Sequence, residues 1–427
     1  MSLARTTLLN GSATAARLAA ALALNKLLAV YVGPAGFGVI GQFHSLMSLL
    51  SAAAGGVFAS GVTKLTAQHA GAPEVQVAVW RTALTLGLLG AGAASLSLLL
   101  FGPYLAAQLL ADASLASAVF WLAAASGLLA VNAVLLAALA GLKKVEAFVA
   151  ASIAGSVVSA GAGALLVLQF GLYGGLIALP IGQALSGVVT ALFFRRVWRS
   201  RWRELVGRLD MRATRTLGSF ALMAATTAIV VPLSQIIIRD GLTRIAGAEM
   251  AGLWQAMWRL SETHLMLLTT TLALHFLPRF SEIADGGELR REVARAYRFV
   301  LPLVGATALT IYLVREPLTL LLFSPAFLPL AQALGWQLIG DVLKIGSWVP
   351  AYTMISHARV RLYITTEIGF SFLVAVACLA GAHHFGLAGA GAGYAATYVL
   401  YWGLLHWQLG RLARRLDARR DVSAVAS

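Results

Sequence analysis

The sequence predicts an all-α polytopic membrane protein, with about twelve transmembrane helices in two six-helix bundles. Composition is the first observation behind this prediction. Hydrophobic residues make up 59% of the chain and charged residues only 11%, whereas a soluble domain carries roughly 25% charged residues. Segment length is the second, because many apolar stretches exceed the roughly 20 residues that cross a bilayer. The stretch from Ala147 to Phe194 contains no charged residue and is long enough for two spans.

Glycine-rich turns mark the ends of several predicted spans, because glycine adopts the backbone conformations that tight turns need. These turns lie at Gly33–Gly36, Gly171–Gly175 and Gly386–Gly389. Hydropathy places about twelve apolar segments between the turn signals. The predicted segments are 8–31, 38–60, 80–101, 116–140, 147–169, 172–193, 217–238, 248–276, 297–315, 330–356, 362–380 and 387–409.

The longest polar stretch, Arg195 to Arg215, falls at mid-chain and predicts the boundary between the bundles. Its Trp198, Trp202 and Leu205 follow one another at i, i+4 and i+7 among arginines, a pattern typical of a helix that lies in a membrane interface. The alternative is a basic cytoplasmic anchor without a specific ligand. The predicted domains are an N-terminal bundle over 1–194, a basic linker over 195–216, a C-terminal bundle over 217–410 and a basic tail over 411–427.

A weak internal repeat also favours two bundles. The sequence GPAGFGV at Gly33–Val39 aligns without gaps with GAEMAGL at Gly247–Leu253, about half the chain further on. Because an even number of spans separates the two motifs, both halves begin on the same side of the membrane and form parallel repeats. In transporters built this way the substrate site lies between the repeats, near the middle of the membrane.

The distribution of Lys and Arg predicts the orientation. Most of the 32 basic residues fall in alternate loops and in the two terminal segments, and short loops rich in Lys and Arg stay in the cytoplasm. Both termini are therefore predicted to be cytoplasmic, with Arg239, Arg244 and Arg315 in outside loops. The same distribution accounts for the net charge of +15 without a nucleic-acid partner.

Several ionisable residues fall inside the predicted spans, where a charge costs several kcal/mol unless it faces a cavity or a partner. Arg17 lies about ten residues into the first span, roughly 14 Å at 1.5 Å per residue, which is too deep for its side chain to reach the interface easily. Asn10 shares its helix face, so we predict that Arg17 faces a cavity. The side chain of Lys26 points about half a helical turn away from that of Arg17. It either extends to the outer interface or, if the helix bends, faces the same cavity as Arg17.

Two later segments carry polar stripes that are too polar to face lipid. The stripes are Gln255, Arg259 and Glu262 in one segment, and Gln337, Asp341, Lys344 and Trp348 in the other. The alternative to a cavity lining is that Arg259–Glu262 and Asp341–Lys344 are ion pairs at i, i+3 that neutralise themselves. Glu367 either belongs to the same cavity, where it is the best proton carrier because its helix offers no basic neighbour, or lies at the interface.

No catalytic pattern accompanies these charges. The eight His residues are scattered, and no Cys-x-x-Cys, His-Glu-x-x-His, Walker or Gly-x-Ser-x-Gly pattern occurs. The single Cys378 excludes an internal disulfide and offers no metal cluster. We therefore predict a transporter rather than an enzyme, without a cofactor, a metal or an ATP site.

The N-terminal run MSLARTTLLNGSATAARLAAALALNKLLAVYVGPAGFGVIGQF, with GVTKLTAQ following at Gly61–Gln68, resembles the Wzx-type polysaccharide and O-antigen flippases. The resemblance is to the enterobacterial common antigen lipid III type, within the multidrug/oligosaccharidyl-lipid/polysaccharide exporter superfamily. It implies a V-shaped pair of six-helix lobes around a cavity. It also implies transfer of an undecaprenyl-diphosphate-linked oligosaccharide, of the O-antigen or common-antigen type, from the cytoplasmic to the periplasmic leaflet of a bacterial inner membrane. A polysaccharide polymerase and a chain-length regulator are the implied protein partners.

In such flippases basic cavity residues receive the diphosphate, and the matching motif supplies Arg17, Lys26 and Lys64. A diphosphate brings about two negative charges that cannot cross hydrocarbon bare, and Arg or Lys in a low-dielectric cavity can replace its water. The predicted substrate-binding residues are Arg17, Lys26, Lys64, Arg259 and Lys344, and the predicted coupling residues or counter-ions are Glu262, Asp341 and Glu367.

Two other functional classes remain open at this point. A drug or cation antiporter of the same superfamily would share the fold but would favour an acidic cavity, whereas Arg17 and Lys26 are cations. An integral-membrane polysaccharide polymerase or ligase would be an enzyme with a large periplasmic loop, whereas the outside loops predicted here are short.

Overall fold

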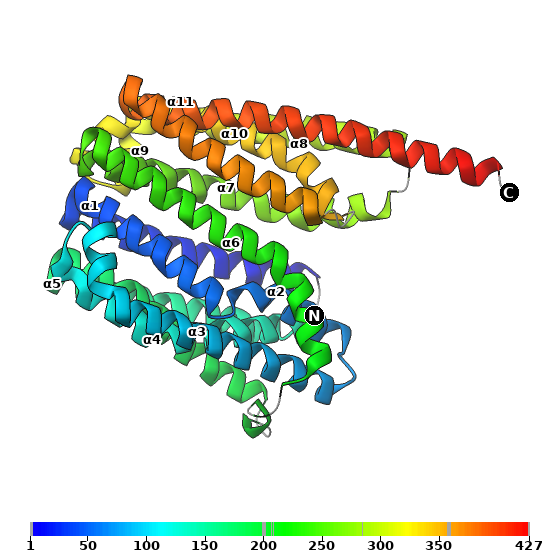
Figure 1. Cartoon of the computed structure of the whole chain (residues 1–427), viewed down its shortest axis with the longest axis horizontal. Coiled ribbons are helices and arrows are strands. Elements are labelled where there is room, and N and C mark those ends of the chain that lie inside the picture. Colours follow the sequence, from blue (N-terminus) through cyan, green and yellow to red (C-terminus); the bar gives the residue numbers. More distant parts are fainter. Residues whose placement is uncertain are drawn as a thin grey trace. The chain divides into compact units, whose positions relative to one another are not determined.

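Helices account for almost all of the part of the chain that the structure describes (Figure 1). The computed structural model describes residues 3–198, 202–205, 207, 209–283, 285–356 and 360–425; for some helical stretches, chiefly 3–17, 267–278 and 419–425, it describes the backbone alone. The chain divides into two compact units, here called unit 1 (Met1–Ile236) and unit 2 (Ile237–Ser427). The boundary falls inside a helix, about twenty residues after the basic stretch at mid-chain.

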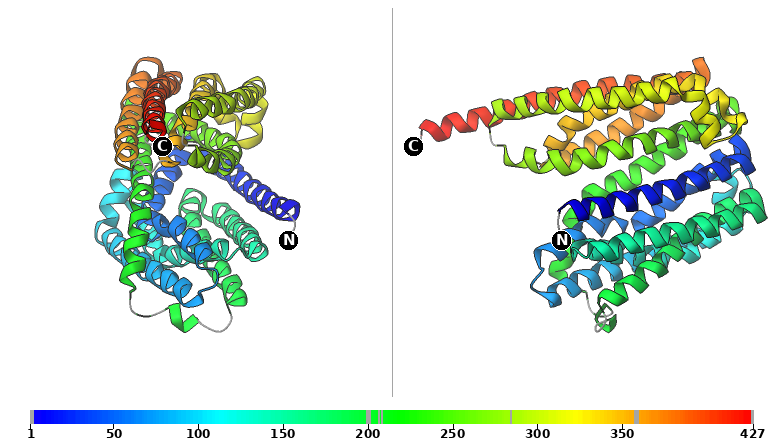
Figure 2. Two further views of the ribbon diagram at one scale, coloured as in Figure 1. Left: turned by 90° about the vertical axis from the view of Figure 1, so that its right-hand side faces the viewer. Right: turned by 180° about the vertical axis from the view of Figure 1, so that it is seen from behind.

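Unit 1 is a bundle whose long helices run side by side (Figures 1 and 2). The helix α5 packs against both α1 and α4, and α3 packs against α4. At one end of the bundle Trp80 is completely buried, with its ring 5.4 Å from that of Phe194. The elements are α1 (Leu3–Ala53), η1 (Gly56–Phe58), α2 (Ala59–Gln68), α3 (Pro73–Leu109), η2 (Ala113–Leu115), α4 (Ala116–Gly141), α5 (Val145–Val197), η3 (Trp202–Leu205) and the first part of α6 (Met211–Ala246).

Unit 2 is organised around α10, which packs against α7, α8 and α11. The buried apolar side chains of these helices form one core, in which Val304 of α8 and Ile345 of α10 are completely buried. The elements are the last part of α6, α7 (Ala248–Glu282), α8 (Gly286–Leu313), α9 (Arg315–Leu322), η4 (Pro325–Phe327), α10 (Leu328–Ser356) and α11 (Val360–Val425).

Three of the long helices are broken at the glycine turns that the sequence predicts. The backbone leaves helical geometry at Gly33 (φ 64°) in α1, at Gly171 (φ 53°) in α5 and at Gly386 (φ 60°) in α11. A positive φ is strained for any residue with a Cβ, so glycine is needed at each break. Eight described helices are long and apolar enough to cross a membrane. Dividing three of them at their breaks and adding α7 gives twelve segments, which confirms the polytopic all-α fold.

The internal repeat is visible in the backbone of both units. Gly33 and Gly247 both have positive φ, 64° and 89°, and each directly precedes a helix. The same holds for Gly171 and Gly386, which are 215 residues apart. Each unit also has one short 3-10 helix directly before a long central helix, α4 or α10. The two units therefore share these features in the same order along the chain.

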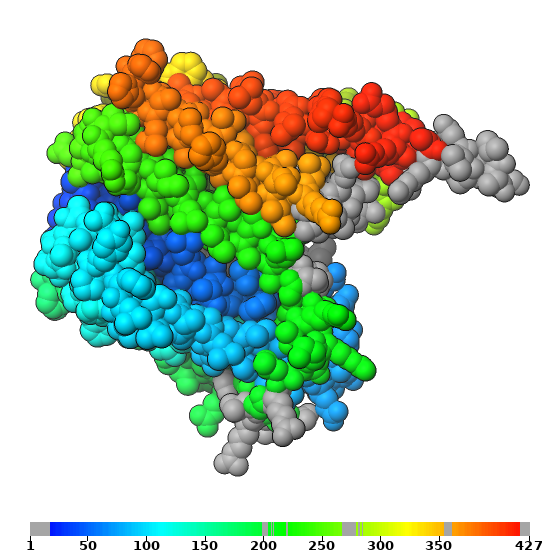
Figure 3. Space-filling model, in the orientation of Figure 1, coloured from blue at the N-terminus to red at the C-terminus, as the bar shows by residue number. Residues whose placement is uncertain are grey.

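The outer surfaces of both units are apolar. In Figure 3 the side chains of α3 and α4 (light blue to cyan) form a continuous face of unit 1. On α3, Leu100 is 67% exposed and Phe101 is 58% exposed; in unit 2, Phe372 of α11 is 71% exposed. Contiguous apolar side chains of this size are stable on a surface that hydrocarbon covers.

The basic stretch at mid-chain does not form the continuous interfacial helix that its spacing predicts. The helix α5 ends at Val197, and between it and the start of α6 at Met211 the described residues form only the short helix η3. Trp198 packs edge-on against Trp80, with ring centroids 5.0 Å apart, and Leu205 is buried in the core of unit 1. These two side chains are therefore core residues of unit 1, while Trp202 has a side chain outside the described residues.

Candidate functional site

A buried polar network lies between α7, α10 and α11 of unit 2. Its centre is Asp341 of α10, whose side chain is completely buried. Oδ1 of Asp341 accepts hydrogen bonds from the hydroxyl of Ser261 on α7 and from the hydroxyl of Tyr394 on α11, the latter at 3.1 Å. Ser261 in turn accepts a hydrogen bond from the side-chain amide of Gln337 at 3.2 Å. A buried carboxylate is stable in such a place because donors replace its water.

His264 is a member of this network that the sequence reading missed. Its side chain is only 5% exposed, and its Nδ1 lies 3.6 Å from Oδ2 of Asp341. Its Nε2 lies 2.9 Å from the hydroxyl of Thr307 on α8. The available signal was local: Ser261 and His264 are three residues apart in α7, and so share a helix face.

Lys344 lies one turn of α10 beyond Asp341, inside a cage of aromatic rings. Its Nζ is 5.1 Å from the ring centre of Trp258, 5.6 Å from Trp348, 5.7 Å from Tyr398 and 6.0 Å from Tyr394. Aromatic faces within about 6 Å attract an ammonium group and replace part of its hydration. The cage thus holds a cation in a largely apolar region by the attraction of its ring faces.

Three carboxylates act electrostatically on Lys344. They are Asp341, Glu262 and Glu367, in that order of strength. The structure therefore brings together four of the residues that the sequence predicts, from three different helices. Glu367 has no basic neighbour in its own helix, but it has one across the helix packing in Lys344.

One of the two predicted ion pairs forms. Arg259 Nη1 and Glu262 Oε2 are 3.8 Å apart, with side chains 39% and 48% exposed. Asp341 and Lys344 are not within 4.0 Å of each other in the structure, because the carboxylate turns toward Ser261 and His264 whereas the ammonium turns into the aromatic cage. The idea that both pairs merely neutralise themselves therefore holds for Arg259–Glu262 alone.

Arg239 is placed differently from the prediction. It does not lie in a loop but inside α6, where only 2% of it is exposed. Its guanidinium donates to Oε1 of Gln255 on α7 at 2.5 Å. The polar stripe of α7 thus begins with an amide that accepts a hydrogen bond from a buried arginine of α6.

The two basic residues of unit 1, among those predicted to bind the cargo, whose side chains the structure describes do not lie together. Lys26 of α1 is half-buried beside the buried Asn25, seven residues before the break at Gly33. Lys64 is exposed on α2, which follows the second half of α1, a helix about 30 Å long at 1.5 Å per residue. Lys26 and Lys64 therefore lie toward opposite ends of unit 1. Arg17 is on α1, but its side chain lies outside the described residues.

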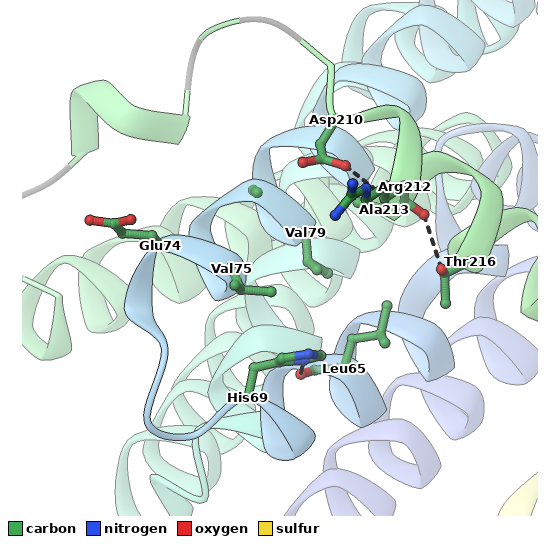
Figure 4. A pocket seen from close by; sticks show the side chains of 10 residues that line it. Leu65, His69, Glu74, Val75, Val79, Asp210, Arg212, Ala213 and Thr216 are labelled. Atoms are coloured by element: carbon green, nitrogen blue, oxygen red, sulfur yellow. Dashed lines mark hydrogen bonds between the residues drawn. The ribbon is translucent and has the colours of Figure 1, made fainter.

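A cavity of about 450 Å³ lies beside α2, where the turn into α3 approaches the start of α6 (Figure 4). Asp210 begins α6 by accepting a hydrogen bond from the backbone of Ala213 at 2.9 Å, and His69 is held by the carbonyl of Leu65 at 2.9 Å. Two acidic residues, Glu74 and Asp210, line it together with the basic Arg212 and with His69. The cavity offers no excess positive charge for an anion.

Comparison with known proteins places the chain in a family. The family described as polysaccharide biosynthesis protein matches residues 27–332. The chain is 30% identical over 416 residues to the lipid III flippase of Escherichia coli (strain K12), covering 95% of this chain and 97% of that protein. The lipid III flippase of Shigella flexneri matches to the same extent.

Solved structures share the fold. A multidrug resistance MATE family transporter of the MOP superfamily in an inward-facing conformation aligns with a TM-score of 0.74 at 16% identity, over 93% of this chain and 96% of that one. The outward-facing conformation of a transporter of this family aligns at 0.71 and 13% identity, over 97% and 96%. A MOP superfamily transporter from Pyrococcus furiosus, described as having a binding pocket of reverse polarity, aligns at 0.65 and 14% identity, over 95% and 93%. Together with the full-length match to flippases, these findings show that the chain belongs to the polysaccharide biosynthesis protein family and is a multi-pass transporter of the flippase class, not an enzyme.

Proposed function

We propose that the chain moves an undecaprenyl-diphosphate-linked oligosaccharide, of the O-antigen or enterobacterial common antigen type, between the leaflets of a bacterial inner membrane. The observation that carries this proposal is the 30% identity, over 95% of the chain, to proteins named lipid III flippase. Transfer runs from the cytoplasmic to the periplasmic leaflet by alternating access. A polysaccharide polymerase and a chain-length regulator, which consume the product, are the proposed protein partners.

The cargo head group is received by basic side chains, and Lys344 is the best supported of them. A diphosphate crossing the membrane needs cations that replace its water. The aromatic cage holds the Lys344 ammonium where three carboxylates act on it electrostatically, so an arriving diphosphate competes with their negative charge. The further proposed contacts are Arg17, Lys26, Lys64 and Arg259, and the proposed counter-ions or coupling residues are Glu262, Asp341 and Glu367.

The positions of Lys26 and Lys64 suggest that they act at different stages of transfer. With both termini in the cytoplasm, as the Lys and Arg distribution predicts, Lys64 meets the head group on the entry side. Lys26, toward the other end of unit 1, meets it on the exit side. The proposed domains, two bundles over 1–194 and 217–410 with cytoplasmic basic segments over 195–216 and 411–427, agree with this orientation.

The aromatic cage argues against a cationic drug as the cargo. Rings such as those of Trp258, Trp348 and Tyr398 would bind a ligand cation, but here the ammonium of Lys344 already occupies the space between them. A cationic drug would have to displace a charged side chain that is part of the same helix.

Translocation in proteoliposomes tests the proposal. A fluorescent undecaprenyl-diphosphate oligosaccharide is reconstituted with the protein, and its exposure to an impermeant quencher or lectin is followed over time. Vesicles with the protein should exchange the lipid between leaflets much faster than protein-free vesicles. Vesicles that leave this lipid in place but transport a cationic dye would contradict the proposal and favour an antiporter.

Cysteine accessibility tests the orientation. Cysteines introduced at Ser200 and Ser427, in a background in which Cys378 is replaced by serine, should be protected from an impermeant thiol reagent in intact cells and become reactive when the inner membrane is opened. Labelling of either site in intact cells would contradict cytoplasmic termini.

A further inference from the structure

The geometry around His264 points to a proton-binding site: we propose that His264 and Asp341 together bind one proton, and that this proton controls the charge that Lys344 offers to the cargo. This inference rests on the proposed function for its role in transport, but the proton site itself follows from hydrogen bonds within unit 2.

The hydrogen bond to Thr307 decides where neutral His264 carries its proton. The hydroxyl of Thr307 lies 3.1 Å from the carbonyl of Leu303 and 3.0 Å from that of Val304, so its single hydrogen is engaged with the backbone of α8. Thr307 therefore accepts a hydrogen bond from Nε2 of His264 at 2.9 Å. A neutral imidazole carries one proton, and with that proton on Nε2 its Nδ1 is an acceptor.

A second acceptor faces that nitrogen. Nδ1 of His264 and Oδ2 of Asp341 are 3.6 Å apart, and both are buried without a hydrogen-bond partner among the described residues. The other oxygen of Asp341 already accepts from Ser261 and Tyr394. Two opposed lone pairs in a region without water are unfavourable, because each buried acceptor loses its hydrogen bond to solvent.

One added proton resolves this arrangement. When Nδ1 of His264 is protonated, it can donate to Oδ2 of Asp341, and the two orphaned atoms become a charge-assisted hydrogen bond. No other atom of the network has to change its partner. The side chains are 5% and 0% exposed, so the proton enters a site that the packing has already formed.

The surrounding charges connect this proton to the cargo. On α7 the nearest charged groups are Arg259 and Glu262, which pair with each other. From α10 comes Lys344; from α11 come the hydroxyls of Tyr394 and Tyr398 and the carboxylate of Glu367; and from α8 the contact is the uncharged Thr307. Asp341 is the carboxylate with the largest effect on Lys344.

Proton binding therefore changes the balance at the candidate site by one charge. The pair of His264 and Asp341 goes from a net charge of −1 to 0, which leaves Lys344 without its main counter-charge. By linkage, a diphosphate then binds more tightly to the protonated protein, and diphosphate binding takes up a proton.

Calorimetry on the purified full-length protein tests the linkage. Binding of farnesyl diphosphate is measured in buffers of different ionisation enthalpy, which reports the number of protons taken up. Wild-type protein should take up more protons than His264→Gln or Asp341→Asn, by up to one proton, and the subtraction removes the titration of the ligand itself. As the pH is lowered, the affinity of the wild-type protein for farnesyl diphosphate should rise more steeply than the affinity of the variants, by up to about tenfold more per pH unit.

Two controls and one further variant make the test specific. His406→Gln on α11 and Asp240→Asn in the exposed ion pair with Arg244 should behave like wild type. Thr307→Val removes the acceptor that holds the proton on Nε2. Neutral His264 can then carry its proton on Nδ1 and donate to Asp341, so the extra proton uptake should be lost although both titrating residues remain. This variant keeps the test informative if Asp341→Asn does not fold.

The outcomes separate the proton site from the proposed cargo. Equal proton uptake by wild type and His264→Gln, or affinity that follows Na⁺ and not pH, would overturn the proton site while leaving a diphosphate flippase intact. A wild type that fails to bind farnesyl diphosphate would instead count against the proposed cargo. The proton site is then decided without ligand by ¹⁵N NMR of the histidines: neutral His264 should carry its proton on Nε2 in wild type and on Nδ1 in Thr307→Val, and the same tautomer in both proteins would overturn the inference.

Discussion

The helices α4 and α10 hold matching places in the two units but have opposite interiors. Each follows a short 3-10 helix and packs against the long broken helix that comes after it, α5 or α11. The helix α4 contains no charged residue, and its most deeply placed hydroxyl, Ser126, is satisfied by Ser95 of α3 at 2.5 Å. The helix α10 carries Asp341 and Lys344, both directed into the packing of unit 2.

This difference separates what the fold requires from what the function requires. The helix α4 shows that the central helix of such a unit can pack against its neighbours without a charged residue. Buried ionic groups are weak contributors to stability, since their desolvation offsets their attraction. We therefore propose that the charges of α10 serve a task that α4 does not have, namely receiving an anion and exchanging a proton.

The largest effect on stability is expected at Asp341. Asp341→Ala leaves Lys344 without its main counter-charge and the hydroxyls of Ser261 and Tyr394 without an acceptor, so we expect the free energy of unfolding in detergent to fall by about 3–5 kcal/mol. The matched change in α4, Ser126→Ala, removes one neutral hydrogen bond and should cost about 1 kcal/mol. Similar losses for the two variants would break the contrast between the helices.

Substitution of the glycines at the breaks should lower the free energy of unfolding by less than Asp341→Ala does, and by similar amounts in both units. Gly33→Ala and Gly247→Ala place a Cβ where φ is 64° and 89°, with no atom within 4 Å of it. Only backbone strain is then added, about 1–3 kcal/mol for each. Gly92→Ala in α3 and Gly218→Ala in α6 are controls that also meet no atom, and in helical geometry they should be neutral or stabilising by up to about 1 kcal/mol. Thermal unfolding of the four variants provides the comparison, and a cost confined to one unit would count against the repeat.

The smallest effect on stability is expected at the exposed ion pair of α7. Arg259 and Glu262 are 3.8 Å apart and more than a third exposed, and such pairs contribute about 0–1 kcal/mol. Arg259→Gln should therefore unfold within about 1 kcal/mol of wild type while lowering the rate of cargo transfer. Loss of stability above this range would mean that Arg259 supports the fold and not the cargo.

Local patterns predicted the backbone well. The breaks at Gly33, Gly171 and Gly386 follow from a requirement of single residues, positive φ, and the sequence shows them directly. The inward stripe of α10 also follows from spacing along one helix. Arg239 was misplaced because hydropathy ends a span at the first charge, whereas Gln255 on the next helix satisfies that charge.

The candidate site was predicted only in part, because its members meet across helices. Asp341 and Lys344 were found, but the cage around Lys344 needs Tyr394 and Tyr398 from α11. His264 acquires its meaning from Thr307 on α8 and Asp341 on α10. Spacing within a helix cannot show which residues of three other helices face one another, so these contacts required the fold.

The central claim is that Lys344 recognises the diphosphate of the cargo. The most direct test compares the translocation rates of a lipid with a diphosphate and a lipid with a monophosphate. Proteoliposomes receive the same labelled oligosaccharide on either an undecaprenyl diphosphate or an undecaprenyl monophosphate. They contain the wild-type protein, the Lys344→Met variant, or, as the matched control, the Lys144→Met variant, whose substitution lies in the exposed turn before α5. Wild type and Lys144→Met should transfer the diphosphate form at least about tenfold faster than the monophosphate form, which corresponds to a free-energy difference of about 1.4 kcal/mol. Lys344→Met should transfer the diphosphate form slowly and should no longer prefer it over the monophosphate form. Transfer of the diphosphate form by folded Lys344→Met at the wild-type rate would contradict the claim.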